Sequence, residues 1–312
     1  MFPDIIMPRL LIFFCCCLIL CCYVPALSAG TGGRAPVASP DRLIRGILTD
    51  AQTGKPLPYV SIGFAGLPAG TMTDSRGAFT LLVSEAYLDR TLRFSVVGYQ
   101  AREIPVRQLL QEQAQKDKLE IRLEVKPKSL AEVQVKGKNK RFVTQVVGSQ
   151  IGKLTPFHHV FENYTYATDV VRGPELGVKI QARKYPAYLQ QVHFCLSGTG
   201  ADITRVRLKL YSLQNNMPHQ EMLQKIIQVD VPPKYTGWIE TDLRPYHLML
   251  EQDVVVALEW LRDENETEKS WLASGLVFSP KNPDYYKAAN QNQWKMLYRE
   301  SVGLYVTLLY QK

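Results

Sequence analysis

The chain has 312 residues, of which 46% are hydrophobic and 10% aromatic, so it is too apolar for a disordered protein and long enough for about two domains. It contains 37 Lys and Arg against 29 Asp and Glu, which gives a formal net charge of +8. Much of this excess is local and no recognition helix is visible, so nucleic acid is not expected as a partner.

The first 29 residues have the pattern of an export signal. Arg9 precedes an almost unbroken apolar run from Leu10 to Val24, and the small residues up to Ala29 suit a signal peptidase. A retained membrane anchor is the alternative, but the run is shorter than the roughly 20 residues that a bilayer helix needs. Residues 30–41 are rich in Gly, Pro, Ala and Ser, which predicts a flexible tether after the cleaved signal.

Five of the six cysteines lie inside this signal: Cys15, Cys16, Cys17, Cys21 and Cys22. The mature chain therefore has no disulfide framework. Cys195 remains, in an apolar stretch with the pattern of a strand. Because burial in apolar surroundings raises the pKa of a thiol, we expect Cys195 to be inert and not a nucleophile.

The segment after the tether carries turn and strand signals in three successive units. In the first, Asp50 and Gly54 favour a turn, and apolar residues alternate from Val60 to Phe64 as in a strand. In the second, residues 74–77 predict a tight turn, again followed by alternating apolar residues. In the third, residues 92–99 predict another strand.

These units resemble, in order, the three motifs of the carboxypeptidase regulatory-like domain: G-x-V-x-D-x-x-T-G-x-P-L-x-x-V, G-T-x-T-D-x-x-G-x-F and S-x-x-G-Y. Leu48 stands where the first motif usually has valine. The resemblance covers about residues 43–125 and predicts a domain over 42–125 with a seven-stranded, prealbumin-like β-sandwich. It implies a fold and not a function, because the domain is an accessory beside peptidases and in outer-membrane receptors of Bacteroidetes-type bacteria. It implies a location in the periplasm or at the outer membrane and cell surface.

A helix is expected from residue 106 to 118, and residues 119–125 alternate as the last strand of this domain. Residues 126–141 then hold six Lys and Arg, opposed only by Glu132. We expect a solvated linker that its own charge keeps extended, between domains that fold separately and share little interface. The alternative is that this segment associates with an anionic membrane surface or polysaccharide.

Strand patterns continue from residue 142 to the end. Apolar residues at 206, 208 and 210 alternate with Arg205, Arg207 and Lys209, which is typical of a sheet with one face in a core and the other in water. Further strands are predicted at residues 225–231, 237–243, 253–261, 271–278 and 302–310. Residues 142–312 are therefore expected to form a second, jelly-roll-like β-sandwich, whose rhythm resembles galactose-binding-like accessory domains. The predicted fold class is all-β.

Aromatic side chains are the candidate ligand-binding residues. Tyr285, Tyr286 and Trp294 lie in a stretch rich in Pro, Asn and Gln, which predicts a loop. Exposed aromatic faces there could stack on sugar rings; the alternative is that they fill the core, as we expect for Trp260. No metal and no cofactor is predicted.

One pair of residues suggests an enzyme. His159 and Glu162 match half of a carboxypeptidase zinc site, and their spacing would place both on one face of a helix, with a third ligand from His193, His219 or His247. The surrounding chain is too rich in β patterns and too short for that catalytic domain, which disfavours the interpretation.

The sequence thus predicts an exported, non-enzymatic binding or accessory protein of the cell envelope. Its expected ligand is a glycan or a partner protein. A zinc metallopeptidase and a small outer-membrane barrel formed after residue 142 are the alternatives. Uneven strand lengths and the Pro232-Pro233 interruption disfavour the barrel.

Overall fold

The computed structural model describes residues 41–116, 118–126, 141–150, 158–161, 165–166, 169–170, 172–262, 272–278, 284–298 and 300–312. The predicted export signal, nearly all of the predicted tether and residues 127–140 of the predicted basic linker lie outside this part. Among the described residues, no helix is both long and apolar enough to cross a membrane.

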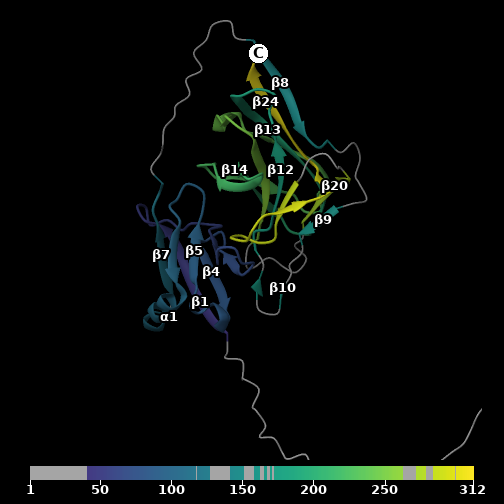
Figure 1. Ribbon diagram of the computed structural model, residues 1–312. Coiled ribbons are helices and arrows are strands. Elements are labelled where there is room, and N and C mark those ends of the chain that lie inside the picture. Colours follow the sequence, from purple (N-terminus) through teal and green to yellow (C-terminus); the bar gives the residue numbers. More distant parts are fainter. Residues whose placement is uncertain are drawn as a thin grey trace, which may run out of the picture. The chain divides into compact units, whose positions relative to one another are not determined.

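The N-terminal module is a sandwich of two sheets, drawn in purple and blue in Figure 1. The first sheet has the order β4-β1-β7 and consists of β1 (Arg42–Asp50), β4 (Ala78–Val83) and β7 (Leu119–Leu123). The second has the order β3-β2-β5-β6 and consists of β2 (Ser61–Gly63), β3 (Gly70–Met72), β5 (Thr91–Ser95) and β6 (Arg102–Pro105). The helical elements are η1 (Glu85–Tyr87) and α1 (Val106–Gln115).

An apolar core joins these two sheets. Ile44 of β1, Phe79 of β4 and Phe94 of β5 are buried in one cluster, and the rings of Phe79 and Phe94 meet edge to face with centroids 6.1 Å apart. Val106 and Leu109 place one face of α1 against the same core. The seven strands in the described part of this module confirm the predicted sandwich, and α1 begins at the predicted residue.

Two aspartates of the sequence motifs build the turns of this module. Asp50 accepts hydrogen bonds from the backbone N–H groups of Gln52 and Thr53, both at 2.8 Å, and from the hydroxyl of Tyr99 at 2.8 Å. Asp74 likewise accepts the backbone N–H of Ala78 at 2.9 Å, which closes the turn before β4. Short polar side chains that bond the backbone a few residues later are what such turns require.

Gly77 is expected to be intolerant of a side chain. Its φ is +76°, and a Cβ there would lie 2.8 Å from the carbonyl oxygen of Leu48. Gly77→Ala should therefore destabilise the protein by about 2–4 kcal/mol, from backbone strain and from the clash together. Gly54→Ala is the matched control, since Gly54 has φ +68° but open space around its Cβ position. Equal losses of Tm in the two variants would mean that the clash contributes nothing.

The C-terminal module holds two larger sheets. In the described residues, one has the order β15-β14-β19-β12-β21-β22 with β16 also on β14. Its strands are β12 (Glu175–Ile180), β14 (Thr204–Gln214), β15 (Met217–Glu221), β16 (Ile227–Val231), β19 (Val254–Leu261), β21 (Asp284–Lys287) and β22 (Lys295–Leu297).

The other sheet has the order β23-β20-β13-β24-β8, with β17 and β18 on β13 and β9 on β20. Its strands are β8 (Phe142–Gly148), β9 (His158–Phe161), β13 (Ala187–Thr199), β17 (Gly237–Asp242), β18 (Met249–Leu250), β20 (Leu272–Phe278), β23 (Glu300–Val302) and β24 (Leu304–Gln311). The remaining elements are the separate pair β10 (Thr165–Tyr166) and β11 (Asp169–Val170), and η2 (Arg244–Tyr246).

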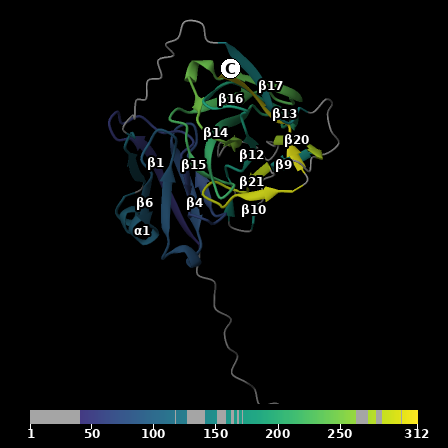
Figure 2. The ribbon, with the colours of Figure 1, turned by 45° about the horizontal axis from the view of Figure 1, so that its top comes forward.

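These two sheets share one core, and Figures 1 and 2 give two views of their strands. Val178 of β12 and Leu208 of β14 belong to the same buried cluster as Phe194 of β13 and Val306 of β24, so the sheets pack as a sandwich. Trp260 is buried in this cluster, as expected. The all-β fold class is thereby confirmed.

The connection between β21 and β22 docks on the N-terminal module. Gln291 adopts a left-handed φ of 64°, and its Nε2 donates to the hydroxyls of Ser61 at 2.9 Å and Ser95 at 2.7 Å. Its Oε1 accepts from Nη1 of Arg93 at 2.8 Å. One side chain of the C-terminal module thus joins β2 and β5 of the N-terminal module.

Two buried contacts extend this interface. Nδ2 of Asn290 donates to the carbonyl oxygen of Thr71 at 2.9 Å, and Nη1 of Arg207 donates to that of Tyr59 at 3.0 Å. Residues 40–312 form one compact unit. The sequence predicts domains that share little interface, whereas these contacts join the two modules directly. The reason is that polar side chains of one module satisfy backbone groups of the other, which strand patterns do not reveal.

Candidate functional site: a polar cleft above buried ion pairs

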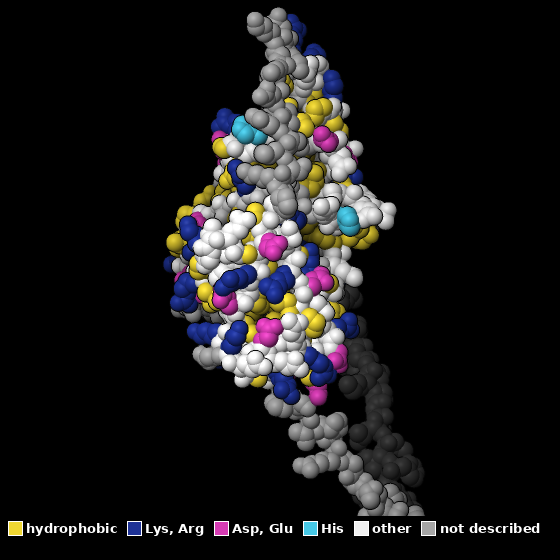
Figure 3. Space-filling model, turned by 90° about the vertical axis from the view of Figure 1, so that its left-hand side faces the viewer, with side chains coloured by type: hydrophobic (Ala, Val, Ile, Leu, Met, Phe, Trp, Pro, Cys, Tyr) yellow, Lys and Arg dark blue, Asp and Glu magenta, His cyan; other side chains and the backbone are white. Residues whose placement is uncertain are grey.

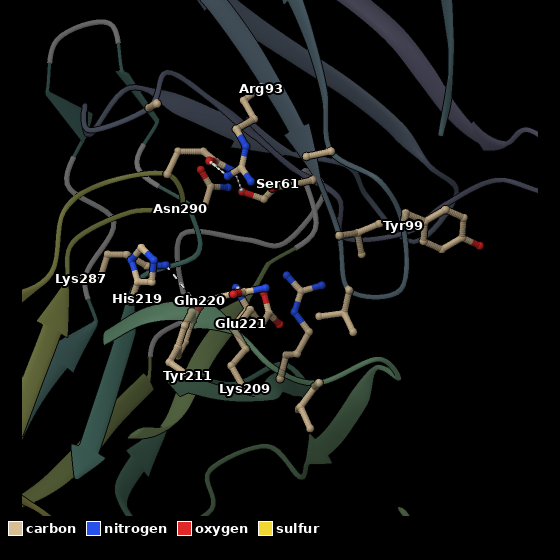
Figure 4. Close-up of a pocket in the computed structure, with 18 of the residues that line it drawn as sticks. Ser61, Arg93, Tyr99, Lys209, Tyr211, His219, Gln220, Glu221, Lys287 and Asn290 are labelled. Atoms are coloured by element: carbon tan, nitrogen blue, oxygen red, sulfur yellow. Dashed lines mark hydrogen bonds and ion pairs between the residues drawn. The ribbon is translucent and has the colours of Figure 1, made fainter. Parts of the chain in front are cut away.

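A polar cleft of about 530 Å³ lies between the N-terminal module and the sheet that carries β14. Figure 4 shows side chains from both sides converging on it. Ser61, Arg93 and Tyr99 line it from the N-terminal module, and Lys209, Glu221 and Trp294 from the C-terminal module. Concave sites with a few convergent polar groups are the usual places for small ligands, so this cleft is the candidate functional site.

The floor of the cleft corrects one expectation about β14. The alternation of Arg205, Arg207 and Lys209 predicts a face in water, yet Arg207 is only 1% exposed and Lys209 only 7%. The N-terminal module and the acidic residues of neighbouring strands cover this face. Period-two alternation therefore identifies a polar face, but it does not reveal what lies on top of it.

Buried carboxylates of β12 and β19 neutralise these two cations. Glu259 is fully buried, and its Oε2 lies 2.6 Å from Nη2 of Arg207 and 3.1 Å from Nζ of Lys209. Glu175 is also fully buried, and its Oε1 lies 3.0 Å from Nζ of Lys209. Buried charges are tolerated only when paired in this way.

A third cation, Lys287 of β21, joins the same network. Its Nζ lies 2.5 Å from Oε1 of Glu175 and 4.9 Å from the centroid of the Trp294 ring. Burial would raise the pKa of Glu175, but the adjacent Lys209 and Lys287 lower it to about 2. Burial lowers the pKa of Lys287 from its usual range, although Glu175 opposes the effect. The hydroxyl of Tyr211 donates to Oε2 of Glu175 at 2.8 Å.

Strand β15 contributes three consecutive residues, His219 to Glu221, to the lining of the cleft. Asn215 and Asn216, with φ of 51° and 57°, form the two-residue hairpin turn between β14 and β15, a turn that requires left-handed residues. His219 and Gln220 of β15 are exposed at the cleft. Glu221 follows, and burial raises the pKa of its carboxyl.

The three predicted aromatic residues have different positions. Tyr285 and Tyr286 lie in strand β21 and not in a loop, because their segment pairs with β12. Tyr285 is fully buried and donates to the carbonyl oxygen of Asn216, so it is not available for stacking on a ligand. Tyr286 is partly buried against the core. Trp294 alone of the three lines the cleft, where it packs edge to face with Tyr211.

The predicted zinc pair does not lie on a helix. His159 belongs to strand β9, which pairs with β20. The prediction that the pair lies on one face of a helix is therefore wrong at His159. Glu162 lies outside the described residues. Of the other proposed ligands, His193 of β13 is stacked on Tyr305 of β24 with ring centroids 4.3 Å apart. The described residues contain no group of three or more His, Cys, Asp and Glu that could hold a metal.

Cys195 is buried in β13, and burial raises the pKa of its thiol. Both features agree with the expected inert thiol.

The sequence alone does not identify the acidic partners on the floor, although one of them leaves a signal. Glu259 interrupts an otherwise apolar run from Val254 to Leu261, and a charge inside a buried strand needs a partner. The sequence alone does not indicate that this partner is Arg207, which lies 52 residues away.

The chain is thus an all-β protein of two sandwiches with a polar cleft beside both. Residues 44–135 match the family model described as CarboxypepD_reg-like domain, so the N-terminal module is such a domain, as the motifs predict. The match covers less than a third of the chain. A search of the curated proteins found no match.

Two similar solved structures come from a clostridial surface protein. One is described as the clostridial cysteine protease Cwp84 after propeptide cleavage, with TM-score 0.38, 11% identity, 53% of this chain and 40% of that chain covered. The other is described as the cysteine protease and lectin-like domains of Cwp84, a surface layer associated protein of Clostridium difficile, with TM-score 0.34, 10% identity, 48% of this chain and 36% of that chain covered. This chain therefore spans less than half of either structure, and likeness at this level carries no functional argument.

Proposed function

We propose that this protein is an exported, non-enzymatic accessory protein of the cell envelope that binds a glycan in the cleft. The cleft itself supports the proposal: half-buried Trp294 lines it together with hydrogen-bonding side chains such as Gln220 and Asn292. Sugar rings present apolar C–H faces and many hydroxyl groups, so they suit an aromatic surface surrounded by donors and acceptors. The export part of the proposal rests on the pattern of residues 1–29 and on the setting of the regulatory-like domain family.

A binding role suits the charged groups of the cleft floor better than an enzymatic one. Arg207, Lys209 and Lys287 are held by Glu175 and Glu259 at distances of 2.5 to 3.1 Å. Groups that satisfy each other so closely form a rigid floor and are poorly placed to transfer protons to a substrate.

The test is a panel of envelope oligosaccharides, probed with the chain from residue 30 onward. We expect binding above background to at least one oligosaccharide, and Gln220→Ala should weaken it about 2- to 10-fold through loss of one hydrogen bond. Gln228→Ala is the matched control, because Gln228 is an exposed glutamine of β16 that does not line the cleft. No binding to any oligosaccharide, or equal loss in both variants, would contradict the proposal.

A partner protein and an anionic membrane surface stay as predictions from the sequence. On the face drawn in Figure 3, Lys and Arg are interspersed with Asp and Glu. Attraction of this face to a membrane would therefore depend on the basic segment 126–141, of which residues 127–140 lie outside the described part.

A further inference from the structure

Glu221 is a carboxylate of the cleft that is poorly held by its surroundings. Its Oε2 lies 4.0 Å from Nζ of Lys209, whereas the carboxylates of Glu175 and Glu259 approach the same atom to 3.0 and 3.1 Å. Within the described residues, its Oε1 is buried and accepts no hydrogen bond. The side chain as a whole is nevertheless 28% exposed, at the end of the edge strand β15.

The cleft keeps a positive charge when Glu221 leaves it. Its lining includes five cationic side chains, namely Arg93, Lys126, Arg207, Lys209 and Lys287, and one carboxylate, that of Glu221. Glu175 and Glu259 lie behind the lining and compensate two charges of the floor. Arg93 also contacts Glu103 at 3.7 Å, but both of these side chains are well exposed and their attraction is screened. Lys126, at the exposed rim, has no ion pair among the described residues.

We propose that the glycan bound in this cleft is acidic, and that its carboxylate takes the place of Glu221 beside Lys209. The inference rests on the proposed glycan-binding function and specifies its substrate class. Without the glycan, Glu221 fills this place with the same functional group as the ligand. Its Oε2 lies 4.0 Å from Nζ of Lys209, a longer distance than an ion pair prefers. Lys126 at the rim adds attraction for the incoming anion, and the partly buried Trp294 lines the same cleft.

The experiment compares trisaccharides of uronic acids with their neutral counterparts by calorimetric titration of the chain from residue 30 onward. Uronate trimers of galacturonic, glucuronic and mannuronic acid cover the common acidic sugars. Glu221→Gln removes the competing charge and keeps the shape, so it should tighten binding of the uronate trimer about tenfold and leave neutral trimers unchanged. Lys126→Gln should weaken uronate binding about 3- to 10-fold; Lys225→Gln, exposed and outside the cleft, is its control.

The results that would overturn the inference differ from those that would overturn the glycan-binding function. If Glu221→Gln weakens uronate binding, Glu221 holds the ligand and the inference is overturned. If neutral trimers bind as well as uronates, or in their place, the acidic class is wrong and the glycan-binding function stands. If no oligosaccharide of either panel binds, the proposed function fails together with the inference. Capture of an acidic peptide in place of the sugars would overturn the assignment to glycans.

Discussion

Glu175→Gln is expected to destabilise the protein by about 3–5 kcal/mol at neutral pH, because it leaves Lys209 and Lys287 buried beside an uncharged amide. Both ammonium groups contact Oε1 of Glu175, at 3.0 and 2.5 Å. The folded pKa of Glu175, about 2, is below its ordinary value of 4.5. The ionised carboxylate therefore stabilises the fold above about pH 4.5, and this stabilisation is lost as the pH falls toward 2.

Urea unfolding at several pH values tests this expectation. The difference in unfolding free energy between wild type and Glu175→Gln should be largest near pH 7 and should shrink below pH 4.5. Glu124→Gln is the matched control, since Glu124 is an exposed glutamate and its loss should change stability by about 0.5 kcal/mol or less. If the unfolding free energies of wild type and Glu175→Gln differ by less than about 1 kcal/mol at pH 7, the buried ion pairs do not depend on Glu175.

Asp284→Asn is expected to have the opposite effect and to stabilise the protein at neutral pH, by up to about 4 kcal/mol. Asp284 is fully buried in β21, and burial raises its pKa from 3.8 to about 7. Its Oδ2 accepts the backbone N–H of Val302 in β23, and its Oδ1 has no hydrogen-bond partner among the described residues. An asparagine oxygen can still accept from Val302, and no charge is left buried.

The sign of the pH dependence follows from the raised pKa. Between about pH 4 and pH 7 the folded state binds a proton that the unfolded state has released, so wild-type stability falls as the pH rises through this window. The advantage of Asp284→Asn should therefore be absent near pH 4 and largest above pH 7. Denaturant unfolding at pH 4, 5.5 and 7.5 measures it. Asp230→Asn, which changes an exposed carboxylate of β16, is the control, and parallel profiles for wild type and Asp284→Asn would refute the expectation.

Local chemistry made the N-terminal module predictable. Asp50 and Asp74 bond the backbone within the next four residues, and Gly77 has the left-handed φ that its turn requires. These interactions span few residues, so the motif that encodes them is visible as a string of letters. The strands of the C-terminal module were predictable for a similar reason: β16, β17, β19, β20 and β24 lie within a few residues of the predicted ranges, because alternation is a local property of each strand.

The candidate site was predicted only in part. The sequence predicts Trp294 as a candidate and Trp294 lines the cleft, whereas it predicts a loop at Tyr285, which is buried in β21. Both residues lie in the same polar stretch, and nothing in their neighbours distinguishes them. Their exposure depends on β12, more than 100 residues earlier in the chain, which pairs with Tyr285 and leaves Trp294 beyond the end of the strand.

The sequence by itself determined the all-β class, the regulatory-like domain and most strand positions, since turns and alternation are written into neighbouring residues. Only the tertiary structure decided that the charged face of β14 is a buried floor and not a surface. Arg207 is paired with Glu259 and with the carbonyl oxygen of Tyr59, 52 and 148 residues away. The physical reason is that the burial of a charge depends on what the fold places above it, and long-range pairing of strands sets that arrangement.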